Sequence, residues 1–156
     1  MVQKKLTKFQ KIFLVAFLFS AVGLWFWGWR WPTAVVELEG KRLHVLVAKS
    51  PRHQYRGLGR RDTLSPYDGM LFVFPITHRV GIVMRDMRFP LDIVWLDKGE
   101  VVDIAPSVPL EPGLDESELT VYRPRLPANA VLELPAGWAE AHGLKIGDRL
   151  RGDSRP

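Results

Sequence analysis

Five side chains in this sequence have the chemistry to recognise or process a small molecule: Arg56, Asp68, Met84, Asp92 and Glu133. Asp92 stands out because the other residues from 91 to 96 are all apolar, which predicts that a buried strand encloses its carboxyl group. A buried carboxyl group needs hydrogen-bond donors or a cation. Asp92 could therefore act as a general acid or base, or contact a ligand. Alternatively, it ties down a neighbouring loop through backbone N–H groups, a structural role that is at least as common for such acids.

Arg56 lies in a strongly basic stretch of the chain. Residues 41–61 contain seven lysines and arginines and no acidic residue. Because the planar guanidinium suits phosphate or carboxylate groups, this stretch predicts a site for an anionic small molecule or an envelope-protein partner. A basic face beside a membrane could also meet lipid headgroups. The plainer interpretation is a solvated face that is balanced by the acidic residues between 111 and 118.

Asp68, Asp92 and Glu133 could instead supply the pair of carboxyl groups that glycosidases use. This second hypothesis describes a periplasmic hydrolase that acts on an envelope carbohydrate or a related substrate. It requires two of the three carboxyl groups to lie within about 5–10 Å of each other in one cleft.

Other catalytic chemistry has no typical arrangement in the sequence. There is no cysteine, and the four histidines lack metal-ligand spacing. The serines lack a nucleophile elbow, and no glycine-rich loop for phosphate is present. We therefore predict no metal and no cofactor, and we favour a binding module over an enzyme. Met84 is most simply core filling, with an apolar ligand pocket as the alternative.

The elements that would position these residues are mostly short strands. Alternating or apolar runs predict strands over residues 34–39, 43–47, 70–74, 80–84, 91–96, 101–104 and 130–134, with a closing strand near residue 150. Ser50-Pro51 predicts the start of a helix that ends by Gly57 or Gly59, and a second short helix is expected over residues 135–142. Residues 105–127 are proline-rich and acidic, which indicates a long surface loop. The predicted fold is a compact, mainly β domain (α+β), barrel-like or two-layered, with two short helices.

The amino terminus has the features of a membrane anchor. Residues 12–29 are an uncharged run of 18 residues, about 27 Å long as a helix against a hydrocarbon core of about 30 Å. Four lysines precede it and Trp25, Trp27, Trp29 and Trp31 cluster at its distal end, as expected of a cytoplasmic end and an interfacial aromatic belt. We predict a cytoplasmic segment (residues 1–11) and a transmembrane anchor (12–31), or alternatively a cleaved signal sequence. The rest would lie on the extracytoplasmic, periplasmic side of the cytoplasmic membrane.

The basic charge of the chain is not evenly distributed. Five of its 22 basic residues and none of its 17 acidic residues lie in residues 1–31, so the remainder holds 17 of each and is formally neutral. A nucleic-acid-binding domain would carry a basic excess. The balance therefore argues against a nucleic-acid partner.

Several linked motifs in residues 34–152 resemble a known family. They are Arg56-Gly57-Leu58, Gly69 to Phe74, Met84 with Pro90 to Ile93, Leu132 to Gly137, and Gly143 to Asp148. In this order they resemble domain of unknown function 192 (DUF192), whose members are bacterial and archaeal and often exported or anchored. The resemblance implies a compact, mostly β domain with no established activity. It points to Arg56, Gly69, Met70, Met84, Pro90, Asp92, Glu133 and Gly137.

The chain departs from the family pattern at two places. Gly59 replaces the usual methionine after Arg-Gly-Leu. Val83 replaces the usual tryptophan before Met84, and Arg85-Asp86-Met87 replaces a Lys-Asn-Thr-like run. If this segment lines a ligand site, the ligand or its affinity differs here.

Overall fold

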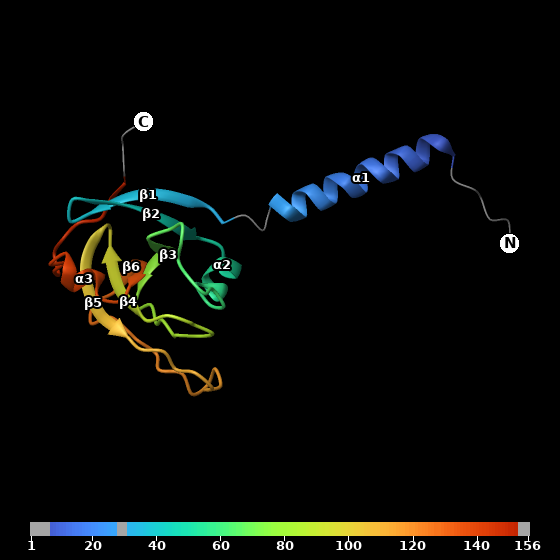
Figure 1. Cartoon of the computed structure of the whole chain (residues 1–156). Coiled ribbons are helices and arrows are strands. Elements are labelled where there is room, and N and C mark those ends of the chain that lie inside the picture. The colour runs from blue at the N-terminus through green and yellow to red at the C-terminus, as the bar shows by residue number, and fades with distance from the viewer. Residues whose placement is uncertain (1–6, 28–30, 153–156) are drawn as a thin grey trace. The chain divides into compact units, whose positions relative to one another are not determined.

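The computed structural model describes residues 7–27 and 31–152, which belong to two separate units, Met1–Trp31 and Pro32–Pro156. The first unit contains helix α1 (Lys8–Trp27) (Figure 1). Thr7 and Gln10 exchange hydrogen bonds of 3.0 and 3.3 Å at its start, which satisfies two backbone N–H groups there. The predicted cytoplasmic segment and anchor include residues 1–6 and 28–30, which lie outside the described residues.

Among the residues that the structure describes, no helix combines the length and the hydropathy needed to cross a membrane.

The second unit is a mainly β domain built on one curled, half-barrel sheet (Figure 1). Its strands are β1 (Thr33–Leu38), β2 (Lys41–Ala48), β3 (Gly69–His78), β4 (Leu91–Asp97), β5 (Glu100–Val108), β6 (Ala128–Pro135) and β7 (Arg151–Gly152). Its helices are α2 (Pro51–Arg56) and α3 (Trp138–Ala141). The strand order is β5-β4-β6-β3-β2-β1-β7. Only the β2–β3 pair is parallel, and α2 lies on the connection between these two strands. The predicted mainly β domain with two short helices is confirmed.

Local sequence signals explain several elements. Glu39 and Gly40 turn the predicted hairpin of β1 and β2 with positive φ angles of 48° and 68°. Ser50 caps α2 by accepting a hydrogen bond of 3.2 Å from the His53 N–H, and Pro51 occupies the first turn, as predicted. The cap and the proline together fix the residue at which α2 begins after β2.

Two expected elements differ in the structure. Residues 80–84 form no strand and make only an isolated bridge, Ile82 with Tyr122. Val80, Ile82 and Met84 are buried and Val83 is half-buried, because the segment packs against the sheet; for example, Trp95 Nε1 donates a hydrogen bond of 2.9 Å to the Val80 carbonyl. β5 continues to Val108, four residues beyond the expected strand, so the long loop begins later than predicted.

One hydrophobic cluster lies on a single face of the sheet, and the two edges of the sheet approach each other. Leu38, Val45, Val94, Leu96, Leu132 and Leu134 are all buried in one cluster, which Ala139 and Leu144 also join. Residues 147–150 bond to the start of β5, through Val101 N to Asp148 O and Leu150 N to Gly99 O, each 2.8 Å. Immediately after residue 150, β7 pairs with β1. The carboxyl-terminal segment therefore bonds to both edge regions of the sheet and supports its curvature.

Gly69 marks a very close approach of two strands. A Cβ atom at this position would lie 2.4 Å from the Glu133 carbonyl oxygen and 3.0 Å from Leu134 Cδ2. We therefore expect Gly69→Ala to force β3 and β6 apart and to lower the free energy of unfolding by about 3 kcal/mol. Urea unfolding measures this, with Gly152→Ala as the control, because nothing lies within 4 Å of a Cβ atom there. Equal stability of the two variants would contradict the close approach.

Candidate ligand-binding site

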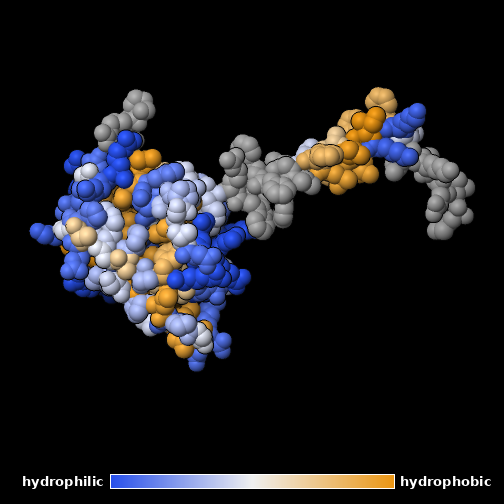
Figure 2. Space-filling model, viewed as in Figure 1, coloured by the Kyte–Doolittle hydropathy of each residue, from blue (hydrophilic) through white to orange (hydrophobic). Residues whose placement is uncertain are grey.

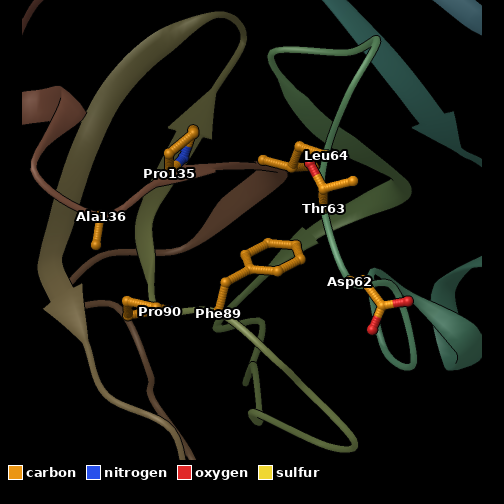
Figure 3. A pocket seen from close by; sticks show the side chains of 7 residues that line it. All are labelled: Asp62, Thr63, Leu64, Phe89, Pro90, Pro135 and Ala136. Atoms are coloured by element: carbon orange, nitrogen blue, oxygen red, sulfur yellow. The ribbon is translucent and has the colours of Figure 1, made fainter.

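A cavity of about 350 Å³ opens where the start of β4 meets the end of β6. Seven residues line it: Asp62, Thr63, Leu64, Phe89, Pro90, Pro135 and Ala136. Figure 3 shows the Phe89 ring between the segment of Thr63 and Leu64 on one side and Pro90 on the other. The lining is mostly apolar, with Asp62 and Thr63 as its polar members. Asp62 forms an ion pair with Arg88, and both side chains are largely exposed.

The wall formed by Pro135 and Ala136 is held in place by Asp92. The Asp92 side chain is fully buried. Its Oδ1 accepts hydrogen bonds from the Ser107 N–H at 2.7 Å and the Gly137 N–H at 3.0 Å, and its Oδ2 accepts one from the Ala139 N–H at 2.7 Å. Both oxygens are thus engaged by backbone donors. The structural alternative for Asp92, an acid that ties down a neighbouring loop, matches this geometry.

A backbone hydrogen bond also joins the two chain segments beside the cavity. The Ala136 N–H donates a hydrogen bond of 3.3 Å to the Pro90 carbonyl, so two lining residues are joined directly. Gly137 follows with a φ of 85°, a left-handed conformation that favours glycine. The chain turns there from β6 into α3, and the N–H groups of Gly137 and Ala139 donate hydrogen bonds to Asp92.

Asp92 and Glu133 lie on opposite faces of the sheet. Directly opposed residues on neighbouring strands project from the same face, and successive residues alternate. Glu133 is paired with Ile93, and Leu134 with Asp92. The two carboxyl groups therefore cannot share one cleft as an acid and base pair.

Glu133 is a buried acid that forms no hydrogen bond or ion pair through its side chain with another described residue. Its side chain is 5% exposed, and Oε2 has no hydrogen-bond partner among the described residues. Its cross-strand neighbours are Met70 and Ile93, both apolar and fully buried. Burial raises the pKa of Glu133 from 4.5 to about 8, because the apolar surroundings disfavour the charged form. Glu133 is therefore mostly uncharged at pH 7.

The other three predicted site residues are dispersed, and none of the five lines the cavity. Arg56 is exposed at the end of α2. Met84 is 2% exposed and part of the apolar interior, as the core interpretation expected. Asp68 is exposed and ties the start of β3 to β2, since its Oδ2 accepts a hydrogen bond of 2.7 Å from the His44 N–H.

The two departures from the family pattern touch each other. A Cβ atom at Gly59 would lie 2.8 Å from the Arg85 carbonyl oxygen and 3.4 Å from Asp86 Cβ. Arg60 bonds to Asp86 through its backbone N–H at 2.8 Å and its Nε at 2.9 Å. A methionine at position 59 has no room in this arrangement, so the changes at 59 and 85–86 belong together.

Arg85 joins three segments of the domain. Its Nη1 donates a hydrogen bond of 2.8 Å to the Tyr55 carbonyl, and its guanidinium lies 4.2 Å from the centre of the Tyr55 ring. Its Nη2 forms an ion pair with Glu116. The acidic loop is therefore attached to α2 through Arg85, which lies outside the basic stretch of residues 41–61.

A second buried acid, Asp103, has a clear partner. Burial acts to raise its pKa, but side-chain and backbone hydrogen bonds from Arg125, with a further one from the Ile104 N–H, outweigh burial and lower the pKa overall. Arg125 Nη2 lies 2.6 Å from Asp103 Oδ1. Asp103 thereby fixes the end of the long loop against β5. Across residues 7–27 and 31–152, no cluster of acids or histidines could hold a metal ion.

Most of the cavity-lining residues were missed by the sequence analysis. Pro90 was singled out through the family pattern, and Pro135 and Ala136 lie in the family motif Leu132 to Gly137. Asp62, Thr63, Leu64 and Phe89 were not singled out. Two prolines at the ends of neighbouring strands were the available signal, because Pro90 precedes β4 and Pro135 ends β6. That signal needs the β4–β6 pairing, which joins segments about forty residues apart.

A family model and one curated relative match the domain. The model of DUF192, described as "Uncharacterized ACR", matches residues 34–152. The UPF0127 protein PF1050 of Pyrococcus furiosus is 29% identical over 115 residues, which cover 72% of this chain and 90% of that protein.

Two crystal structures share the fold. A "putative transcription regulator" from Sinorhizobium meliloti 1021 has a TM-score of 0.69 and 30% identity, covering 78% of this chain and 95% of that one. A protein of unknown function from Novosphingobium aromaticivorans DSM 12444 has a TM-score of 0.63 and 28% identity, with 77% and 83% covered.

Proposed function

The chain belongs to the DUF192 family of uncharacterised proteins, and we propose that it is a binding module tethered to the cytoplasmic membrane. Its second unit, residues 32–156, would lie on the periplasmic side and bind a small ligand in the cavity between β4 and β6. The observation that carries this proposal is the cavity itself, with a wall that Asp92 holds through three backbone hydrogen bonds.

The lining indicates the class of ligand. A cavity of about 350 Å³ is within the size range of small-molecule sites. Phe89, Leu64 and the two prolines offer apolar contacts, and a ring could stack on Phe89. Asp62 and Thr63 at the margin can accept hydrogen bonds from hydroxyl or amino groups. A compact ligand with an apolar face and one polar end fits these features best.

The proposed anchor is supported by the composition of α1 and its flanks. In the part of α1 up to Ser20, whose side chains the structure describes, the apolar side chains are exposed; Phe9, Phe13, Phe17 and Phe19, for example, are 69–77% exposed. Figure 2 shows this apolar surface on α1. An all-round apolar helix is stable in a bilayer or a protein core rather than in water. The preceding lysines favour a cytoplasmic amino terminus, which would place residues 32–156 outside.

The alternatives receive less support. A hydrolase built on Asp92 and Glu133 is disfavoured, because these acids project from opposite faces of the sheet. The description of the Sinorhizobium protein suggests regulation of transcription for that protein. The balanced charge of residues 32–156 does not favour extending it to this chain.

Filling the cavity tests the proposal. We expect Ala136→Phe to weaken the binding of cavity-directed fragments at least tenfold, because the new ring occupies the ligand's volume. Saturation-transfer NMR with a library of aromatic and saccharide fragments, applied to the full-length chain in detergent, measures this.

Ala141→Phe is the matched control, because Ala141 is exposed on α3 and away from the lining. It should bind the same fragments as the unmodified chain. The proposal is wrong if every detected fragment binds equally well to Ala136→Phe.

A further inference from the structure

A cluster of positive charge surrounds α2. We define the basic patch as Lys49, Arg52, Arg56, Arg60 and Arg61, of which all but the half-buried Arg61 are exposed. Figure 2 shows a strongly hydrophilic surface over α2. No acidic residue lies between positions 41 and 61 to offset this charge within the segment.

Arg56 is central to the basic patch. Burial is the main cause that lowers the pKa of both His53 and Arg61, and the charge of Arg56 lowers both pKa values further. Arg52 also lowers the pKa of His53. Arg56 makes no ion pair with another described residue. The acids near the patch are already engaged, Asp86 with Arg60 and Glu116 with Arg85. The charge of Arg56 itself is therefore available to an external anion.

The basic patch lies at the end of the domain where the chain enters it. The Pro32 carbonyl accepts a hydrogen bond of 2.7 Å from the Val47 N–H, and Thr33 is paired with Leu46. Lys49 follows Val47 by two residues, and α2 begins at Pro51. Pro32 alone separates the proposed anchor from β1. A membrane-embedded anchor would thus hold this end of the domain near the bilayer surface.

We propose that the basic patch binds anionic lipid headgroups of the bilayer that holds residues 12–31, an inference that rests on the proposed anchor. Surface charges act over a Debye length of about 8 Å at physiological salt. The tether is short, since only Pro32 lies between residue 31 and β1, and the planar guanidinium groups of the arginines suit phosphate oxygens. The contact would set the orientation of the domain on the membrane.

The test uses the full-length chain in vesicles of phosphatidylcholine alone, or with about one-third phosphatidylglycerol. Phenylglyoxal modification of Arg56, followed by mass spectrometry, reports its accessibility. Arg149 of the same molecule is the internal reference, because it bonds to Glu100 outside the patch. We expect Arg56 to react at least about threefold more slowly on the anionic vesicles at low salt, and the difference to vanish in about 0.5 M salt.

Charge reversal identifies the surface. Lys49→Glu with Arg52→Glu should abolish the protection of Arg56, and a glutamate in the first turn of α2 is compatible with the helix. The matched control, Lys41→Glu with Lys145→Glu, makes the same change of charge at exposed positions outside the patch and should retain the protection.

The outcomes separate the two proposals. Equal Arg56 reaction rates on both vesicles, while the protein floats with them, overturn the headgroup contact and leave the anchor standing. Failure to float with either vesicle overturns both. Equal protection by inorganic phosphate on neutral vesicles would assign the patch to a soluble anion and would also overturn the lipid assignment.

Discussion

Replacing Asp92 with asparagine is expected to lower the free energy of unfolding by about 3 kcal/mol, since a buried donor without an acceptor costs roughly 1–3 kcal/mol. The asparagine NH₂ group would face N–H donors that now bond to a carboxyl oxygen, at a site with no solvent exposure. At least one of the three backbone N–H groups then loses its acceptor. The remaining bonds also lose the strength that a charged acceptor gives.

Urea unfolding of the full-length chain in detergent checks this expectation. Asp97→Asn is the control, because Asp97 ends the same strand and its carboxyl group accepts a hydrogen bond of 3.2 Å from the Thr77 hydroxyl instead of three from backbone N–H groups. Amide exchange under native conditions adds a local measurement, in which Gly137 and Ala139 should exchange faster. An unchanged midpoint together with unchanged exchange at these two amides would show that Asp92 does not hold the cavity wall.

Replacing Glu133 with glutamine is expected to remove a large pH dependence of stability. The folded-state pKa of Glu133 is raised to about 8 from 4.5. Its side chain therefore destabilises the fold least below pH 4.5, where it is protonated in both states. As the pH rises from 4.5 to 8, the unfolded chain loses the proton while the folded chain keeps it. The free energy of unfolding then falls by about 1.4 kcal/mol per pH unit. The total loss reaches roughly 4 kcal/mol near pH 8.

The measurement compares urea unfolding at pH 5 and pH 8. At each pH, the free energy of unfolding of the unmodified chain is compared with that of Glu133→Gln. This difference should be about 3 kcal/mol less favourable to the unmodified chain at pH 8 than at pH 5, because glutamine has no titrating proton. Glu140→Gln, an exposed position on α3, should retain the full pH dependence. Parallel pH profiles for the unmodified chain and Glu133→Gln would refute a buried neutral acid.

The titration of Asp103 does not affect this comparison. Because its pKa is lowered from 3.8, the stability it contributes is present above pH 3.8 and is lost as the pH falls through its folded-state pKa. That window lies below pH 5. Asp103 is also present in both proteins, so its contribution cancels in the difference.

Much of the fold follows from local patterns in the sequence. The alternation in residues 34–47, the Ser50-Pro51 helix start and the apolar run of 91–96 each correspond to an observed element. The segment 80–84 does not, because short apolar stretches can be buried as irregular chain when they pack against a sheet. Its hydrophobicity predicted burial correctly and secondary structure wrongly.

The candidate site was much less predictable. The chemistry of Asp92 and Glu133 suggested a functional pair, but their relation depends on register, and a shift of one residue exchanges the faces of a strand. β6 lies between β4 and β3, a non-local arrangement that no motif records. The cavity forms where those strands end, so apolar and proline residues line it, while the motif acids shape the structure around it.

The most direct test of the account is a methyl NMR titration of the full-length chain in detergent with the fragments that the cavity screen identifies. Leu64 and Ala136 each carry methyl groups in the lining. We predict that their signals shift most, and that Ala136→Phe abolishes the shift at Leu64. Shifts confined to residues around Arg56, with Leu64 and Ala136 unchanged, would contradict a ligand site between β4 and β6.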